Sequence, residues 1–390
     1  MPHIHIKSFN PVALPAKKDN VDFHFMASNV AHTDEHLIAT SIDDKQFFLL
    51  VKDTPENVLL KSEKISRPSP TYIVKQALNQ YAALSESEIL ASNVNDTSKH
   101  VHLEKDESLW SIHDFGKGFP EAKDVRIEVG FGSGRHLIHQ AKENPDILFI
   151  GIEIHKPSVE QALKQINILG LKNLILLDYD ARLFLELVPS NIVSRVYVHF
   201  PVPWDKKPHR RVISPAFITE STRVLAPQGR LELRTDSENY FAYSWETFIS
   251  LNKAKLEVNK NQEIAISSKY EDRWKKMEKN IYDITLINEE ISAELNLEGS
   301  FLFKNGLDEE RLLKLNTTTQ KVEGGFIHFE RLYKTDDERM MFRVSMGSFE
   351  RPEHLYIIIG KEKSYYFPTQ PVPSQINFAV HKHLDELLHG

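Results

Sequence analysis

The chain of 390 residues contains no cysteine. Disulfide bonds, zinc sites with cysteine ligands and catalysis by a thiol are therefore excluded. Long apolar runs are also missing, because no stretch approaches the roughly 18 uninterrupted apolar residues that a membrane-spanning helix needs. The first twenty residues lack the apolar core of a signal peptide. We therefore expect a soluble, cytoplasmic protein.

The sequence has no excess of positive charge either. Its formal net charge is -7, and 26% of its residues are charged. This balance argues against a protein that coats nucleic acid without specificity. It is compatible with a local basic patch on an acidic body, so charge has to be assessed segment by segment.

Three segments of the chain differ in their pattern of apolar residues. Residues 1–110 contain short apolar strands with polar turns, followed by a helix and a loose linker. Residues 111–287 alternate strands with helices, which predicts a parallel sheet covered on both faces. Residues 288–390 return to strands and close with a helix. The predicted fold class is α/β, with a Rossmann-like sheet between a β-rich N-terminal module and a β-rich (α+β) C-terminal module.

A glycine-rich turn follows the first strand of the central segment. After the strand DVRIEV come Gly130, Gly132 and Gly134, and a helix begins just beyond them. Such a turn lets the backbone approach a ligand closely and directs free helix N–H groups at it. A dinucleotide fingerprint needs its third glycine one position later, where this chain has Arg135. The spacing, with Glu128 just before the turn, therefore favours S-adenosylmethionine over NAD.

Two more acidic residues follow the next two strands. Glu153 closes the strand FIGIEIH, where a carboxylate can accept hydrogen bonds from both ribose hydroxyls of a nucleoside. Asp180 lies at the tip of the third strand, where it can accept from an adenine amino group or, equally well, cap the helix ARLFLELV. Together these patterns predict a nucleoside cofactor. The candidate cofactor-binding residues are Glu128, Gly130, Gly132, Gly134, Glu153 and Asp180.

The fourth strand runs directly into a rigid, basic segment, HFPVPWDKKPHRR, residues 199–211, which we call the elbow. Pro201 and Pro203 fix φ and remove two N–H groups, which predicts a stiff ledge beside the reacting centre. Trp204 can stack on a base or fill the floor of a cleft. Most basic runs are only solvated helix faces, but this one follows the predicted cofactor site, which favours a phosphate-bearing substrate. Its basic residues are Lys206, Lys207, Arg210 and Arg211.

Two further segments are predicted to reach the same edge of the sheet. Asp236, in LRTDSENY, follows the fifth strand and can accept from the amino or imino edge of a base, or cap a turn. The segment SSKYEDRWKK, residues 267–276, combines a hydroxyl, a cation, an aromatic ring and a carboxylate, although alone it would pass for a surface helix. The residues concerned are Ser268, Lys269, Tyr270 and Glu271.

In this order, IEVGFGSG, GIEIHK, DYDA, FPVPWDKKPHRR, RTDSENY and SKYEDR resemble the bacterial tRNA (guanine-N7)-methyltransferases over roughly residues 112–285. The resemblance implies a class I methyltransferase sheet that uses S-adenosylmethionine to methylate guanine 46 in the tRNA variable loop. It also implies that Ser268 stands where the family has threonine, a change that keeps the hydroxyl. The residues that it assigns to the cofactor are Glu128, Glu153 and Asp180, and those that it assigns to the substrate are Lys206, Asp236 and Ser268 to Glu271.

One departure from the family lies in the elbow. The family has Pro-Asp-Pro-Trp there, and its aspartate is taken as both a cofactor contact and a catalytic residue, whereas this chain has Val202. Guanine N7 carries an exposed lone pair, so methyl transfer needs no prior deprotonation and depends mainly on orientation. A carboxylate could still stabilise the positive charge that develops on the purine. Asp205 and Asp236 are our candidate catalytic residues, with Asp178 as a further possibility.

The predicted function is transfer of a methyl group from S-adenosylmethionine to N7 of guanine in tRNA. Val202 motivates an alternative, a catalytically impaired tRNA-binding protein that keeps the fold. A methyltransferase for another RNA base is a second alternative, and the glycine spacing disfavours an NAD-linked oxidoreductase. The flanking modules could bind more of the tRNA, mediate assembly or only stabilise the protein. His3 and His5 have metal-ligand spacing, but no further ligand is identifiable, so no metal site is predicted.

Overall fold

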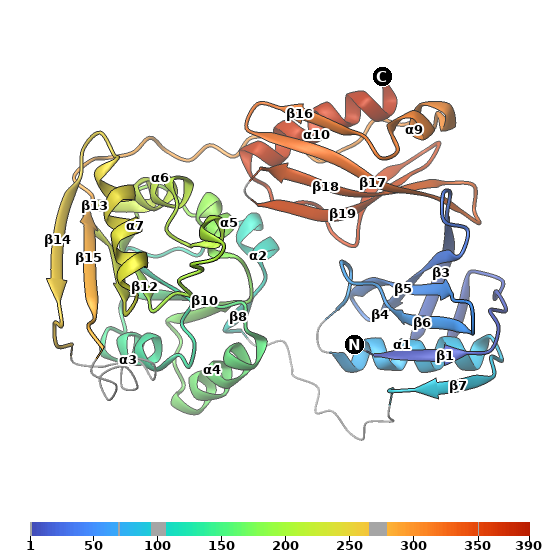
Figure 1. Ribbon diagram of the computed structural model, residues 1–390, viewed down its shortest axis with the longest axis horizontal. Coiled ribbons are helices and arrows are strands. Elements are labelled where there is room, and N and C mark those ends of the chain that lie inside the picture. The colour runs from blue at the N-terminus through green and yellow to red at the C-terminus, as the bar shows by residue number, and fades with distance from the viewer. Residues whose placement is uncertain (1, 69–70, 95–106, 265–278, 350) are drawn as a thin grey trace. The chain divides into compact units, whose positions relative to one another are not determined.

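The computed structural model describes residues 2–68, 71–94, 107–264, 279–349 and 351–390 (Figure 1). The chain divides into two compact units. Unit 1 consists of Met1–His102 together with Glu298–Gly390, and unit 2 is Leu103–Leu297. The sequence predicts separate modules at 1–110 and 288–390, and the structure differs, because strands from both segments pair in one sheet. Among the described helices, none is both long enough and apolar enough to cross a bilayer.

Unit 1 is built mainly from antiparallel strands, which alternate apolar and polar residues as expected for half-buried strands. Its helices are α1 (Thr71–Leu84), α9 (Glu309–Leu315) and α10 (Gln375–His389). Its strands are β1 (His3–Ile6), β2 (Ala16–Lys18), β3 (Val21–Asn29), β4 (Glu35–Ile42), β5 (Lys45–Asp53), β6 (Val58–Ser62), β7 (Ile89–Ser92), β16 (Thr319–Val322), β17 (Gly325–Thr335), β18 (Met340–Ser348), β19 (Pro352–Ile359) and β20 (Ser364–Phe367).

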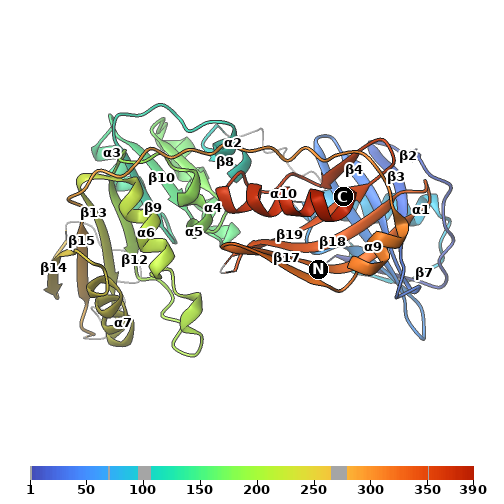
Figure 2. The same ribbon diagram turned by 90° about the horizontal axis from the view of Figure 1, so that it is seen from above.

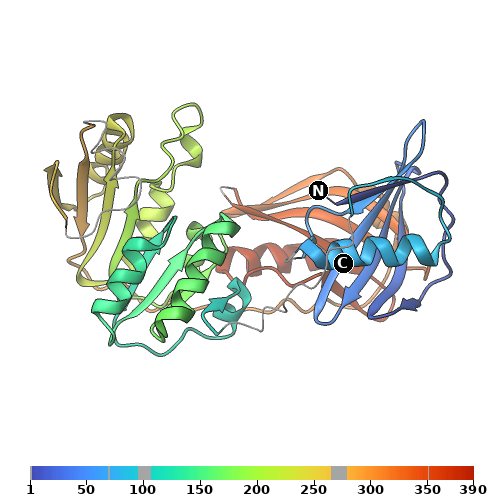
Figure 3. The same ribbon diagram turned by 90° about the horizontal axis from the view of Figure 1, so that it is seen from below.

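The strands of unit 1 form one sheet in the order β20-β19-β18-β17-β3-β4-β5-β6-β1-β7, with β16 beside β17 and β2 beside β3. The two halves of this sheet meet where β17 pairs antiparallel with β3, with Tyr333 opposite Asn29. Helix α10 lies along β17 and β18 (Figure 2), and α1 lies against β1, β4 and β6 (Figure 3). Each helix therefore closes an apolar core on its own half of the sheet.

A third core and a buried polar network tie the two halves of unit 1 together. Phe48 of β5 packs edge-on against Tyr356 of β19, at 4.8 Å between ring centres. Glu35, which is buried, accepts hydrogen bonds from Arg331 at 2.6 Å and from the Tyr333 hydroxyl at 2.7 Å. These partners lower the pKa of Glu35 although its burial acts in the opposite direction. The two ends of the chain thus share one folded unit.

Glu353 of β19 gives unit 1 a testable pH dependence. Its carboxylate accepts from the backbone N–H of Val372 at 3.1 Å and from the side chain of Asn377 in α10, and burial raises its pKa to about 7. A carboxyl that binds its proton more tightly in the fold than when unfolded stabilises at low pH, so stability should fall as pH rises from about 4.5 to about 7.

We expect Glu353→Gln to remove most of this dependence, because the amide oxygen keeps an acceptor and carries no charge. Relative to the variant, the wild type should lose about 3 kcal/mol between pH 4.5 and pH 8. Amide hydrogen exchange of α10 measures this loss locally. Glu362→Gln, at an exposed site, is the matched control. Equal pH profiles for all three proteins would contradict the assignment.

Unit 2 alternates strands and helices as the sequence predicts. Its helices are α2 (Ile112–Lys117), α3 (Arg135–Glu143), α4 (Lys156–Leu169), α5 (Ala181–Phe184), α6 (Pro215–Val224) and α7 (Glu238–Ile249), with 3-10 turns η1 (Leu185–Leu187) and η2 (Pro208–Arg210). Its strands are β8 (Leu109–Trp110), β9 (Val125–Val129), β10 (Leu148–Ile152), β11 (Leu174–Leu177), β12 (Val193–His199), β13 (Leu225–Thr235), β14 (Lys255–Lys260) and β15 (Tyr282–Ile287).

The sheet of unit 2 has the order β14-β15-β13-β12-β9-β10-β11-β8. Strands β8 to β13 pair in parallel, and β15 is antiparallel to β13 and β14. From β9 the chain moves outward through β10 and β11, then returns to β12 on the other side of β9. Because right-handed crossovers run in opposite directions from this point, α3 and α4 cover one face and α6 and α7 the other. The carboxyl ends of β9 and β12 therefore border the topological switch point, where doubly wound sheets bind their ligands.

Local signals explain the helices that frame this switch point. Helix α3 begins directly after the glycine turn, and α4 ends at Gly170, whose φ of 65° suits a glycine cap. Ser214 caps α6 by accepting a hydrogen bond from the Phe217 N–H. The helix predicted to begin just beyond the glycine turn is confirmed as α3.

Candidate active site

The glycine turn has a backbone that ordinary side chains rarely adopt. Gly130, Gly132 and Gly134 have φ values of 71°, 54° and 70°, all in the left-handed region. The end of the neighbouring strand β10 fixes the turn. Gly130 N–H donates to the Ile152 carbonyl at 2.8 Å, and Gly132 N–H donates to the Glu153 carboxylate at 2.9 Å. The N-cap residue of α3 is Gly134, which has no side chain to cap the helix. The turn therefore forms a backbone cradle beside a helix N-terminus, which suits an anionic or nucleoside group.

Glu153 follows β10 and organises the edge of the sheet. One carboxylate oxygen accepts from Gly132 N–H and the other from His155 N–H, both at 2.9 Å. Each oxygen retains a second lone-pair direction. The position beside the cradle suits the ribose contact that the sequence predicts.

Glu128 has surroundings that the sequence does not reveal. Its side chain lies on the face of β9 that α3 covers, is 4% exposed, and contacts His136 Nδ1 at 2.7 Å. His136 stands in the first turn of α3, so the pair links β9 to α3 across the glycine turn that connects them. The carboxylate is thus engaged inside the fold, and a direct cofactor contact, as predicted for Glu128, is not supported by this geometry.

Asp180 acts as a helix cap in this structure. Its side chain accepts from Arg182 N–H at 2.9 Å and forms a two-pronged ion pair with the Arg182 guanidinium, whose shortest contact is 2.7 Å. Of the two roles that the sequence left open, this is the capping one. Asp178, two residues earlier, lies 3.7 Å from the Lys156 ammonium, and its pKa is raised mainly by burial.

The elbow follows β12 as an irregular loop with two strained positions. Phe200 and Trp204 have φ values of 51° and 47°, which non-glycine residues seldom adopt. Val202 is 61% exposed at the apex. The Arg210 guanidinium lies 5.1 Å from the centre of the Trp204 ring, a distance suited to a cation–π contact. Lys206, Lys207 and Arg210 are exposed and available to a phosphate.

Arg211 does not share that exposure, and its predicted substrate contact needs correction. The residue is 6% exposed. Its Nε donates to the Pro203 carbonyl at 2.8 Å, and a terminal nitrogen lies 3.3 Å from Asp205. Its guanidinium packs 5.2 Å from the Tyr240 ring centre and 4.6 Å from that of Tyr243. Arg211 therefore stabilises the elbow internally, because it donates hydrogen bonds to Pro203 and Asp205 of the same loop.

The candidate catalytic carboxylates are both paired with cations. Asp205 contacts Arg211, and Asp236, after β13, accepts from the Lys279 ammonium at 2.8 Å. Ser268, Lys269, Tyr270 and Glu271 lie outside the described residues. Among the described residues, no cluster of acidic or histidine side chains is arranged to hold a metal ion.

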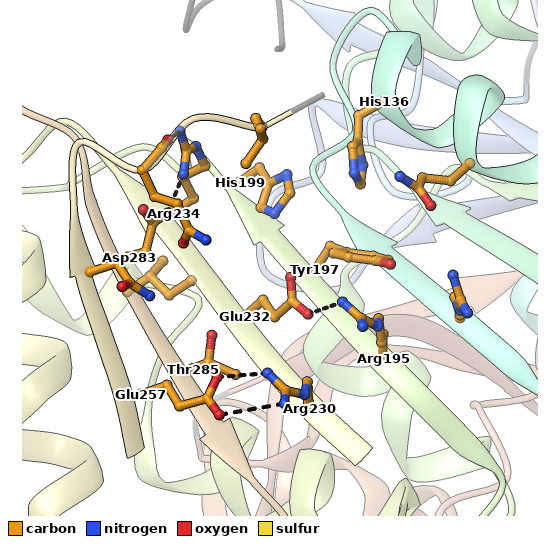
Figure 4. Close-up of a pocket in the computed structure, with 16 residues that line it drawn as sticks. His136, Arg195, Tyr197, His199, Arg230, Glu232, Arg234, Glu257, Asp283 and Thr285 are labelled. Carbon is orange, nitrogen blue, oxygen red and sulfur yellow. Dashed lines mark hydrogen bonds and ion pairs between the residues drawn. The ribbon is translucent and has the colours of Figure 1, made fainter. Parts of the chain in front are cut away.

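A polar pocket beside this edge was missed by the sequence reasoning. It has a volume of about 410 Å³ and lies on the face of the sheet that α3 also covers. Figure 4 shows His136 and His199 facing each other, with Tyr197 beside them and Arg195 further along the same strand. The signal was the alternation of Arg195, Tyr197 and His199 with buried valines along β12.

The doubly wound sheet and its glycine turn at the switch point define unit 2 as a Rossmann-like cofactor-binding domain. Residues 122–284 match the family model Methyltransf_4, described as "Putative methyltransferase". This match places the unit among the methyltransferases.

Curated relatives narrow the class further. A tRNA (guanine-N(7)-)-methyltransferase of Wolinella succinogenes is 40% identical over 100% of both chains. Proteins with the same description from Campylobacter fetus and Helicobacter hepaticus are 39% and 36% identical over 100% of this chain and 99% of their own. The chain therefore belongs to the tRNA (guanine-N(7)-)-methyltransferase family. Because these alignments span the full length, they include unit 1.

Proposed function

We propose that this protein transfers a methyl group from S-adenosylmethionine to N7 of guanine, at position 46 of the tRNA variable loop. The observation that carries the proposal is the arrangement around the switch point. The glycine turn, Glu153 and the elbow follow the carboxyl ends of β9, β10 and β12, so a cofactor and a nucleic-acid substrate can approach the same edge.

The residues at the glycine turn fit the proposed cofactor. The left-handed glycines leave the backbone open to a close approach, and Glu153 would accept hydrogen bonds from ribose hydroxyls. The bound cofactor would supply a methyl group on a positively charged sulfur. Glu128 and His136 would hold the turn in position from below.

The elbow would hold the tRNA substrate. Its exposed Lys206, Lys207 and Arg210 suit the phosphate backbone, and Trp204 offers a ring face. Because guanine N7 already carries a lone pair, the main task of these residues is to hold the base in line, so catalysis would come from proximity and orientation. Asp236 would accept from the base edge, with its charge moderated by Lys279.

The test uses the full chain, S-adenosylmethionine with a tritiated methyl group, and unmodified tRNA. The label should appear at one guanine, located by borohydride reduction and aniline cleavage of the RNA. Label at another base would overturn the N7 assignment. Cofactor and tRNA binding without transfer would favour the alternative of an impaired tRNA-binding protein, for which Val202 is the motivating observation.

Val202→Asp should raise the rate of methyl transfer by about three- to tenfold, because a carboxylate near the developing charge stabilises the transition state by about 1 kcal/mol. The side chain is exposed, so the substitution buries no charge. The comparison is single-turnover transfer at saturating cofactor. Val202→Asn, which adds a dipole without charge, should give a smaller gain. An unchanged rate in Val202→Asp would mean that this enzyme needs no carboxylate at the elbow.

A further inference from the structure

The pocket on the sheet face of unit 2 is polar and has a surplus of one positive charge. Three of its arginines are each paired with a carboxylate, Arg195 with Glu232 at 2.6 Å being one example (Figure 4). The other two pairs are Arg230 with Glu257 at 2.7 Å and Arg234 with Asp283 at 2.6 Å.

Arg126 of β9 is the fourth arginine of this pocket. Within the described part of the chain it forms no ion pair, and its Nε is buried without a hydrogen-bond acceptor. Its guanidinium packs 5.8 Å from the centre of the Phe149 ring, which holds the side chain in place. A buried donor without a partner is costly, so this end of the pocket is suited to an anion.

The opposite end of the pocket is lined by aromatic rings. His136 and His199 have ring centres 4.7 Å apart, and Tyr197 lies 4.9 Å from His136. Burial is the main cause that lowers the pKa of His199 well below its ordinary value, and the charges of His136 and Arg234 add to it. His199 is therefore neutral near pH 7, with one donor and one acceptor, and no partner among the described residues takes either.

The two ends are separated by a length that suits one nucleotide. Arg195 is the register partner of Arg126, and His199 lies four residues further along β12, about 13 Å at the usual rise of a strand. Unpaired RNA bases are bound by stacking on aromatic or histidine rings, while phosphates are bound by arginine. His199 is also the first residue of the elbow, so the ring end of the pocket adjoins the proposed tRNA site.

We propose that this pocket binds one unpaired nucleotide of the tRNA, with its base at His136 and His199 and its phosphate at Arg126. The inference rests on the proposed function, since it names where that substrate extends beyond the elbow. An RNA nucleotide is favoured over a peptide, because the single unpaired cation matches its phosphate and the cluster of rings matches its base.

The experiment compares tRNA binding by Arg126→Gln and His199→Ala across a salt titration. Arg126→Gln should weaken binding about three- to tenfold near 0.1 M salt and reduce the salt slope by about one. His199→Ala should weaken binding about tenfold with an unchanged slope, because stacking releases no counterion. Arg126→Lys, which keeps the charge, should recover most of the affinity.

Lys142→Gln removes an exposed charge from α3 outside the pocket lining and should bind tRNA as the wild type does. All variants should bind S-adenosylmethionine normally, which reports that unit 2 is folded. If both pocket variants bind tRNA as the wild type does at every salt concentration, the pocket proposal is wrong. If the wild type itself neither binds nor methylates tRNA, the proposed function fails instead.

Discussion

Glu153→Ala is expected to weaken the binding of S-adenosylmethionine by about 10- to 100-fold. The carboxylate fixes the glycine turn through Gly132 N–H and is the proposed acceptor for the ribose. A hydrogen bond to a charged group is worth about 1.5–3 kcal/mol, so the net loss of about one such bond accounts for the expected change. Titration calorimetry measures the change in affinity, while tRNA binding in the absence of cofactor should be unaffected.

Two further variants sharpen this result. Glu153→Gln retains one acceptor oxygen and should fall between the wild type and alanine. Glu160→Ala removes an exposed carboxylate from α4 and should bind the cofactor normally. If Glu153→Ala bound S-adenosylmethionine with unchanged affinity, Glu153 would not be part of the cofactor site.

Arg211→Ala is expected to lower the free energy of unfolding of unit 2 by about 2–3 kcal/mol, because a charged hydrogen bond and two cation–π contacts are lost. Without this side chain the Pro203 carbonyl, which lies between the strained Phe200 and Trp204 in the chain, loses its hydrogen-bond donor. We therefore expect methyl transfer to fall about 100-fold at saturating cofactor, as small misplacements of a reactive group can do. Denaturant melts and single-turnover kinetics measure the two effects separately.

Arg210→Ala is the matched comparison, because it removes the same side chain from the neighbouring, exposed position. It should leave stability nearly unchanged, weaken tRNA binding and lower the salt slope by about one. The two variants thus distinguish an internal support from a phosphate contact. Equal losses of stability in both would contradict the assignment of Arg211 as the internal support.

Much of the sheet in unit 2 is predictable because its strands and helices carry strong local signals. Buried parallel strands appear as short apolar runs such as LILL, and Gly170 predicts where helix α4 ends. The strands β14 and β15 were not predicted, since β14 is largely exposed and lacks a clear apolar pattern. The pairing of β3 with β17 depends on residues some 300 positions apart, which no local pattern encodes.

The site was predictable to the level of strand ends but not of side-chain partners. Order along the chain locates Glu153 beside the glycine turn, because consecutive parallel strands end at one edge. It cannot tell that Arg211 is inside the elbow whereas Arg210 is outside, since both lie in the same basic run. Likewise Glu128 and Asp180 have partners, His136 and Arg182, that only the folded backbone selects.

The joint between β3 and β17 makes unit 2 an insertion within unit 1. Strand β3 ends at Asn29 and β17 begins at Gly325, so a ribosome that adds about 5–20 residues per second needs tens of seconds to supply the partner strand. During that time the methyltransferase unit can already fold, while an apolar edge and the Glu35 carboxylate await Arg331. Unit 1 is therefore the first unit whose synthesis begins and the last to be completed. A nascent chain arrested before β17 would leave β3 as an exposed edge strand that could pair with the wrong strand.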